Sequence, residues 1–159
     1  MQVQKMMTSN PACVTPDDTI RDAARLMKEH DCGLIPVVES RDSKRLVGVV
    51  TDRDLAVRAI GEGKSADTKV AQVMSRDPSC ASPDTDVREV ERIMSERQVR
   101  RVPVVDSAGR LAGIVAQADL ALSDNAGVSD REVARTVERI SQPSESSRSA
   151  SSAEKRATP

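Results

Sequence analysis

The sequence predicts an α+β fold, close to α/β in character, in which two tandem β-α-β-β-α units pack as a pseudo-two-fold pair. The main observation is an internal repeat: the stretch that starts at Met7 recurs from Met74 at an offset of 67 residues, which becomes 65 later in the copy. The residues of the first copy that recur unchanged include Met7, Pro11, Cys13, Pro16, Asp17, Arg21, Met27, Pro36, Val37, Val38, Leu46, Gly48, Asp54 and Leu55. A period this long exceeds that of solenoid repeats, so it indicates two copies of one small folding unit. Since a unit of about 60 residues is only marginally stable alone, we expect the copies to stabilise each other.

Each copy opens with a short extended segment, residues 12–15 and 79–82, that runs into a helix-start signature. The signature reads TPDD at residues 15–18 and SPDT at residues 82–85. Hydroxyl and carboxylate oxygens accept hydrogen bonds from the free N–H groups of a first helical turn, and proline is tolerated there. We therefore expect a helix to begin at each signature.

The apolar residues that follow are spaced for one face of a helix. In the first copy they are Ile20, Ala23, Ala24 and Met27. In the second copy they are Val87, Val90 and Met94.

Two short β-type runs come next in each copy. They cover residues 34–38 and 46–50 in the first copy, and residues 102–105 and 111–115 in the second. Pro36 lies inside the first run and has no N–H to donate, so this strand is expected at a sheet edge or at an interrupted position. A second helix is predicted from about Asp52, and its counterpart from about Gln117.

These patterns divide the chain into five parts. Unit 1 covers residues 1–62, a linker covers 63–68, and unit 2 covers 69–125. An additional helix is predicted within residues 126–141, with Ser129 as its cap. Residues 142–159 are rich in Ser and lack apolar periodicity, so we expect a disordered tail.

Composition argues against several classes of partner. The chain has 24 basic and 25 acidic residues and contains no Phe, Tyr or Trp, so its core must be aliphatic. Neither a nucleic acid nor a membrane is favoured as a partner by this charge balance, and aromatic stacking platforms for single strands are missing. The N-terminal residues do not resemble a signal peptide, which predicts a cytoplasmic protein.

The cysteines and the single histidine give little support for catalysis or metal binding. Cys13, Cys32 and Cys80 form no C-x-x-C pair, and His30 has no second imidazole or paired nucleophile near it in sequence. His30 instead suits the C-terminal end of the first helix, where a cation complements the helix dipole. We predict no catalytic residue and no metal site.

The segment GVVTDRDL, residues 48–55, is the sharpest functional candidate. A strand runs into a helix, with Thr51 at the junction and Asp54 three residues later. A hydroxyl and first-turn N–H groups can hold a phosphate, and a carboxylate can accept hydrogen bonds from a ribose diol. The same pair is also typical of a capping box that serves the helix alone.

The repeated order of elements, with h-P-V-V (h, hydrophobic) before G-h-h-T-x-x-D, resembles the CBS domain family over roughly residues 3–125. Two tandem copies resemble a CBS pair, also called a Bateman module. This resemblance implies a non-catalytic regulatory module that binds an adenosine nucleotide such as AMP, ADP or ATP in the cleft between the copies. It also implies a flat homodimer and a regulated protein partner whose identity is unknown. No obligatory cofactor is implied, and Mg²⁺ is expected only alongside ATP.

Carried over to this sequence, the resemblance assigns the ribose to Asp54 and the phosphate to Thr51. Ile35 and Val37, which flank Pro36, would contact the adenine through backbone and aliphatic surface. Two basic residues just before the second h-P segment, Arg100 and Arg101, would reach the phosphates of the first site. Arg53, beside the junction of strand and helix, is a weaker candidate for the same contact.

The second copy departs from this pattern because Ala116 replaces the hydroxyl residue. Asp119 is retained, with Val102 and Val104 as the counterparts of the adenine contacts. The loss of one charge-assisted hydrogen bond costs about 1.5–3 kcal/mol, or roughly ten- to a hundredfold in affinity. We predict one strong site around Asp54 and a second that is weak, empty or differently selective.

Two other functions remain open from the sequence. The first is a scaffold that dimerises without binding a ligand, in which Thr51 and Asp54 only cap a helix. The second is a redox or metal protein based on the cysteines.

Overall fold

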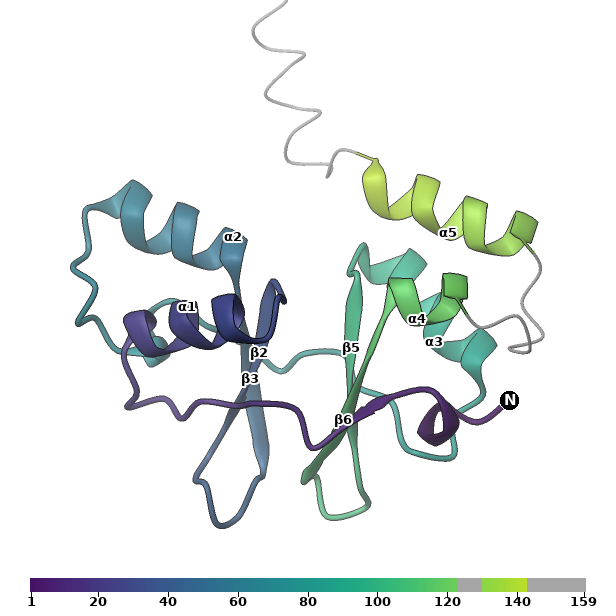
Figure 1. The fold of residues 1–159 in the computed structure, drawn as a ribbon, viewed down its shortest axis with the longest axis horizontal. Coiled ribbons are helices and arrows are strands. Elements are labelled where there is room, and N and C mark those ends of the chain that lie inside the picture. Colours follow the sequence, from purple (N-terminus) through teal and green to yellow (C-terminus); the bar gives the residue numbers. More distant parts are fainter. Residues whose placement is uncertain (123–129, 143–159) are drawn as a thin grey trace, which may run out of the picture.

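The computed structural model describes residues 1–122 and 130–142, which form two similar halves side by side (Figure 1). The first half contains α1 (Ile20–Glu29), β2 (Leu34–Val38), β3 (Leu46–Thr51) and α2 (Asp52–Asp54). The second half contains α3 (Val87–Arg97), β5 (Arg101–Val105), β6 (Leu111–Ala116), α4 (Gln117–Leu122) and α5 (Asp130–Ser141). The predicted α+β class with paired repeats is confirmed.

Each half has one three-stranded antiparallel sheet, with strand order β2-β3-β4 in the first and β1-β6-β5 in the second. The proline-containing strands β2 and β5 lie at sheet edges, as expected from the missing N–H of Pro36. The initial extended segments supply only one residue each to this edge. Val14 pairs with Val37, and Ala81 pairs with Val104, both as isolated parallel bridges.

The start of each repeat packs on the opposite half. β1 (Thr8–Ser9) pairs with β6, and β4 (Ser75–Arg76) pairs with β3. Val3, in the 3-10 turn Val3–Lys5, is buried in the core of the second half, whereas Val70, in the 3-10 turn Val70–Gln72, is buried in the first. The predicted units 1–62 and 69–125 are contiguous stretches of the chain. In space, the segment that begins each unit packs on the half formed by the other unit.

The first helix of each repeat begins later than its sequence signature predicts. Residues 15–18 form a turn, in which the Thr15 N–H donates to Asp18, and α1 begins after Thr19. Thr19 and Asp22 form the capping box, and α3 is capped by Asp86 instead of Ser82. The start predicted at the signatures was therefore wrong, because a second hydroxyl or acid four residues further on takes the cap.

The buried faces of these helices agree closely with the apolar spacing. Val87, Val90 and Met94 are fully buried, and Ile20, Ala23 and Met27 are buried. Ala24 is exposed, so its assignment to the buried face was wrong. The buried hydrophobic residues form one cluster in each half, and both clusters are aliphatic.

α2 continues without a break through a π-helical turn, Leu55–Ala59, and a 3-10 turn, Ile60–Glu62. The additional helix is present as α5, although its predicted cap, Ser129, lies outside the described residues. The tail from residue 143 onward also lies outside them. None of the helices in the described ranges is long and apolar enough to cross a membrane.

The two β-hairpin tips join the halves at the bottom of Figure 1. The Leu46 N–H donates to the Gly109 carbonyl oxygen at 3.0 Å, and the Leu111 N–H donates to the Lys44 carbonyl oxygen at 2.8 Å. This contact and the exchanged strands tie the halves together at one end of the molecule. The other ends of β3 and β5 are left facing each other across a cleft.

Candidate functional site

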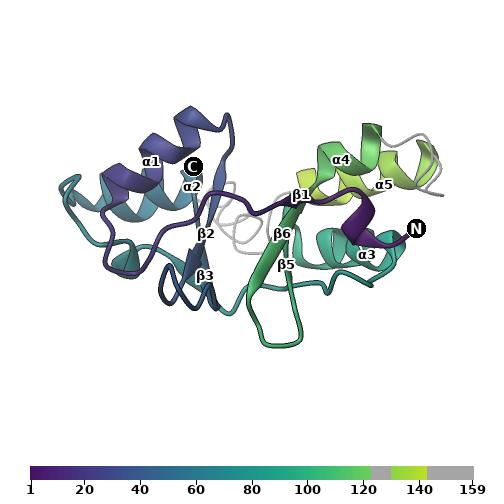
Figure 2. The same cartoon turned by 60° about the horizontal axis from the view of Figure 1, so that its bottom comes forward.

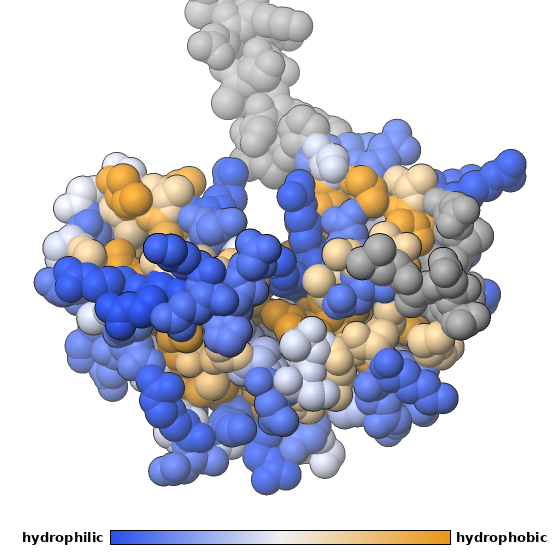
Figure 3. All heavy atoms as spheres, in the orientation of Figure 1, coloured by the Kyte–Doolittle hydropathy of each residue, from blue (hydrophilic) through white to orange (hydrophobic). Residues whose placement is uncertain are grey.

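A cleft of about 600 Å³ lies between the two halves, within the usual size range of small-molecule sites. The space-filling view shows a notch between the halves with hydrophilic surface on both sides (Figure 3). The residues that line the cleft are Gly33, Leu34, Thr51, Asp52, Arg53, Gln98, Val99, Arg100, Arg101, Ile140 and Gln142. The first five belong to the first half and the others to the second.

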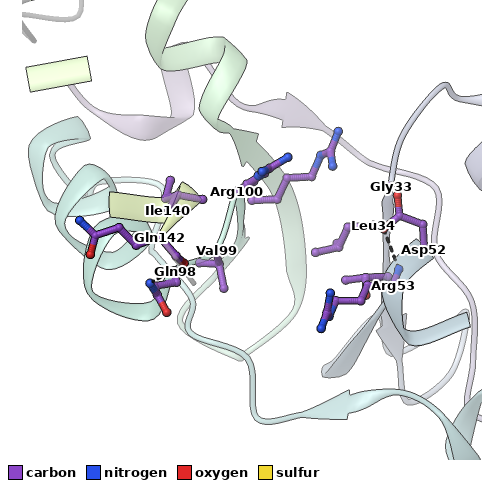
Figure 4. Close-up of a pocket in the computed structure, with 11 residues that line it drawn as sticks. Gly33, Leu34, Asp52, Arg53, Gln98, Val99, Arg100, Ile140 and Gln142 are labelled. Carbon is purple, nitrogen blue, oxygen red and sulfur yellow. Dashed lines mark hydrogen bonds between the residues drawn. The ribbon is translucent and has the colours of Figure 1, made fainter. Parts of the chain in front are cut away.

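The wall from the first half is built where β2 starts and β3 ends. These ends are paired because Leu34 lies opposite Thr51 in the antiparallel register. The Asp52 N–H donates to the Gly33 carbonyl oxygen at 3.0 Å, a bond drawn in Figure 4. A Cβ at Gly33 would lie 2.7 Å from Asp52 Oδ2, so glycine allows this close approach. The start of α2 is thereby fixed at the edge of the cleft.

Thr51 and Asp54 form a complete capping box at the start of α2. Thr51 Oγ1 accepts from the Asp54 N–H at 3.0 Å, and Asp54 Oδ2 accepts from the Thr51 N–H at 3.0 Å. The Thr51 hydroxyl therefore serves the helix as an acceptor and keeps its own hydrogen for donation. Since Thr51 lines the cleft, the capping geometry is compatible with a second role as a ligand donor.

Asp54 lies behind this wall and does not itself line the cleft. Its residue exposure is 9%, and its Oδ1 lies 3.7 Å from Arg58 Nε. The ribose contact assigned to Asp54 stays a prediction. In this geometry the Asp54 carboxylate also holds Thr51 in place by accepting the hydrogen bond from its N–H.

Three arginines converge on the cleft from both halves. Arg53 follows the junction on the first half, and Arg100 and Arg101 lie at the start of β5 on the second. None of the three guanidinium groups forms an ion pair with any residue in the ranges 1–122 and 130–142. Three guanidinium groups against the single carboxylate of Asp52 leave an excess of positive charge around the cleft. This excess favours an anionic ligand, because arginine binds phosphate through paired N–H donors.

The predicted adenine contacts lie in the core and not in the cleft. Ile35 is 1% exposed and Val37 is fully buried, so their side chains pack among the aliphatic residues of the first half. The apolar surface of the cleft comes instead from Leu34, Val99 and Ile140. The contact of Ile35 and Val37 with a base stays a prediction.

Sequence reasoning missed most of the second wall, including Gln98, Val99, Ile140 and Gln142. The sequence offered one indication of this wall: Val99 directly precedes Arg100 and Arg101, which were predicted to reach the site. Ile140 lies in the last turn of α5 and Gln142 directly follows that helix, both outside the repeat, and no pattern in the sequence placed α5 beside the cleft.

The second copy keeps only half of the capping box. Asp119 Oδ2 accepts from the Ala116 N–H at 2.7 Å, but Ala116 offers no hydroxyl to the Asp119 N–H. Val102 and Val104 are fully buried, as are their counterparts in the first copy. The weaker second site predicted at Asp119, Val102 and Val104 stays a prediction.

Ala116→Thr is expected to complete this box and raise the free energy of unfolding by about 1 kcal/mol, because an N-cap hydroxyl contributes roughly that amount. Chemical denaturation of the variant and of the parent protein measures the change. Ala112→Thr, in the preceding strand, is the control and should not stabilise the protein. Equal stabilisation by both variants would contradict the capping explanation.

The cysteines and His30 lie away from the cleft. All three cysteines are free and partly buried, and burial raises the pKa of the Cys80 thiol, which lowers its reactivity. His30 is exposed at the C-terminal end of α1, as predicted. Within the described part of the chain, no group of three or more His, Cys, Asp or Glu residues is arranged to hold a metal ion.

The solved structures that share this fold include two with adenosine ligands and one with zinc ions. CBSX2 in complex with AMP is 28% identical, with a TM-score of 0.64 over 89% of this chain and 98% of its own. The CBS domain pair of protein MJ0100, in complex with 5-methylthioadenosine and S-adenosyl-L-methionine, is 27% identical, with a TM-score of 0.69 over 76% and 93%. Hypoxic Response Protein I with two coordinated zinc ions is 32% identical, with a TM-score of 0.70 over 77% and 98%.

Sequence comparison gives the same assignment. The CBS domain-containing protein YhcV of Bacillus subtilis (strain 168) is 41% identical over 121 residues, which are 76% of this chain and 84% of YhcV. The CBS domain model matches residues 3–60 and 70–123. The match of the CBS domain model to both repeats, together with a relative of 41% identity, shows that this chain belongs to the CBS domain family, as a tandem CBS pair.

Proposed function

We propose that this chain is a non-catalytic regulatory module that binds a phosphate-bearing adenosine ligand, such as AMP, ADP or ATP, in the cleft at Thr51. The observation that carries the proposal is the convergence of Arg53, Arg100 and Arg101, without ion-pair partners in the described ranges, on that cleft. Related CBS pairs in complex with AMP, and with 5-methylthioadenosine and S-adenosyl-L-methionine, support an adenosine-containing ligand.

The two kinds of surface in the cleft suit the two ends of such a ligand. Leu34, Val99 and Ile140 offer aliphatic contacts to a purine, and aromatic residues are not required. The arginines and the Thr51 hydroxyl suit a phosphate. Mg²⁺ would enter only together with ATP.

A homodimer and an unidentified protein partner belong to the same proposal. The side chains of Val57 and Ile60 are 54% and 77% exposed on the helical run that follows α2. Exposed aliphatic residues of this kind favour self-association. Sedimentation equilibrium tests this part: we expect the mass of a dimer for the wild type and a lower mass for Ile60→Asp. The mass of a monomer for the wild type would contradict the homodimer.

The phosphate contact predicts that AMP binds at least about tenfold more tightly than adenosine, the difference that a charge-assisted hydrogen bond makes. Isothermal titration calorimetry with AMP, ADP, ATP, adenosine, NAD and S-adenosylmethionine measures this ratio. If no compound binds at millimolar concentration, the scaffold function is favoured and the proposal fails.

The double variant Arg100→Ala/Arg101→Ala should bring the affinity for AMP close to that for adenosine. Arg97→Ala is the matched control, because Arg97 is exposed at the end of α3 and does not line the cleft. An AMP preference that survives in the double variant would place the phosphate elsewhere.

A further inference from the structure

The C-terminal helix α5 lies outside the two matched repeats, yet it forms part of the cleft. The CBS matches end at residue 123, and α5 covers Asp130–Ser141. The helix packs against α3 and α4 of the second half, as Figure 2 also shows. Its last turn brings Ile140 and the following Gln142 to the cleft wall (Figure 4).

α5 is held on α3 by specific buried contacts. The Thr136 side chain is 3% exposed, and its hydroxyl donates to Glu91 Oε1 at 2.6 Å. Ser95 Oγ donates to Thr136 Oγ1 at 3.4 Å. Ile140 is buried in the aliphatic core of the second half. The position of α5 is therefore determined by polar and apolar contacts along its length.

Gln98 links the end of α5 to the basic wall of the cleft. Its Nε2 donates to the carbonyl oxygens of Arg139 and Gln142, both at 3.3 Å, at the point where the helix ends. Gln98 also ends α3 with a left-handed backbone (φ 53°) and is followed within three residues by Arg100 and Arg101. The loop that carries the two arginines is thus fastened to α5.

We propose that α5 is a ligand-responsive element, whose docking on α3 and the occupancy of the cleft stabilise each other through Gln98 and Ile140. This inference rests on the proposed nucleotide site and deepens it. When α5 is docked, it supplies an aliphatic wall and holds the arginine loop. By thermodynamic reciprocity, a ligand that prefers this arrangement must strengthen the docking of α5.

Hydrogen exchange of the full chain, read by mass spectrometry with and without AMP, tests this coupling. A ligand that binds only the docked state of α5, present at about ten times its Kd, lowers the population of the undocked state by about tenfold. Amides that exchange only when α5 is undocked then exchange more slowly by up to about the same factor. We expect the amides of residues 133–141 to slow by about that factor.

Thr136→Val loosens α5 at a position that does not line the cleft. Loss of the hydroxyl contact is expected to speed exchange in α5 and to weaken AMP binding by about three- to tenfold. Glu138→Gln, at an exposed position on the same helix, is the matched control and should leave both unchanged.

The outcomes separate this inference from the proposed function. If the wild type binds AMP while exchange in α5 is unchanged and Thr136→Val binds equally well, the coupling is overturned and the nucleotide site stands. If the wild type does not bind AMP in calorimetry, this inference falls together with the AMP site.

Discussion

Asp54→Ala is expected to lower the affinity for AMP by about a hundredfold, whereas Asp119→Ala should change it by less than about threefold. Asp54 completes the capping box with Thr51, and its carboxylate is the predicted ribose contact. Removal of the carboxylate takes away a charged acceptor and also leaves the Thr51 N–H, at the edge of the cleft, without its acceptor. Calorimetric titration of both variants with AMP measures the difference.

Asp22→Ala is the control for loss of a helix cap alone. Asp22 and Thr19 form the same box at the start of α1, in the same half of the molecule, but neither lines the cleft. We expect Asp22→Ala to lower the free energy of unfolding by about 1 kcal/mol, as cap removal usually does, without weakening AMP binding. Equal effects of Asp54→Ala and Asp119→Ala on affinity would contradict the predicted ranking of the two sites.

Gly48→Ala is expected to lower the free energy of unfolding by about 1–3 kcal/mol, the usual cost of overpacking. A Cβ at Gly48 would lie 2.6 Å from the carbonyl oxygen of Ser75, in the exchanged strand β4. The backbone of β3 and β4 must therefore separate to accept it. Urea denaturation of the variant measures the loss.

Two further glycines provide a graded comparison. At Gly113 the Cβ would meet Met7 Sδ at 2.5 Å, in a flexible side chain, and the Thr8 carbonyl oxygen at 2.9 Å. At Gly61 the nearest atom is 3.3 Å away. The loss of stability should therefore fall from Gly48→Ala through Gly113→Ala to Gly61→Ala, and a loss at Gly61 as large as at Gly48 would contradict the steric explanation.

The parts of the fold that depend on local pattern could be predicted. The apolar spacing of Val87, Val90 and Met94 identified the buried face of α3, because a helix repeats every 3.6 residues. Pro36 correctly indicated an edge strand. The helix starts were less accurate, because residues 15–18 contain the same types of residue as a cap and only the backbone path distinguishes a turn from a first helical turn.

The candidate site was predicted only in part for a related reason. Thr51, Arg53, Arg100 and Arg101 all line the cleft, because each lies at or within two residues of the end of a strand that the repeat had located. The side chains of Ile35 and Val37 lie in the core. A hydrophobic residue in a strand can face either a core or a cleft, and sequence alternation does not say which.

By itself the sequence determined that two copies of one unit exist, that both have the same order of elements, and that the copies differ at Thr51 and Ala116. These properties are local, or they follow from comparing one part of the chain with another. Only the tertiary structure decided that β1 and β4 exchange halves and that the end of α5 lines the cleft beside Gln98. Both features depend on contacts between residues far apart in the chain, and their partners are chosen by packing and by backbone hydrogen bonds that no local pattern encodes.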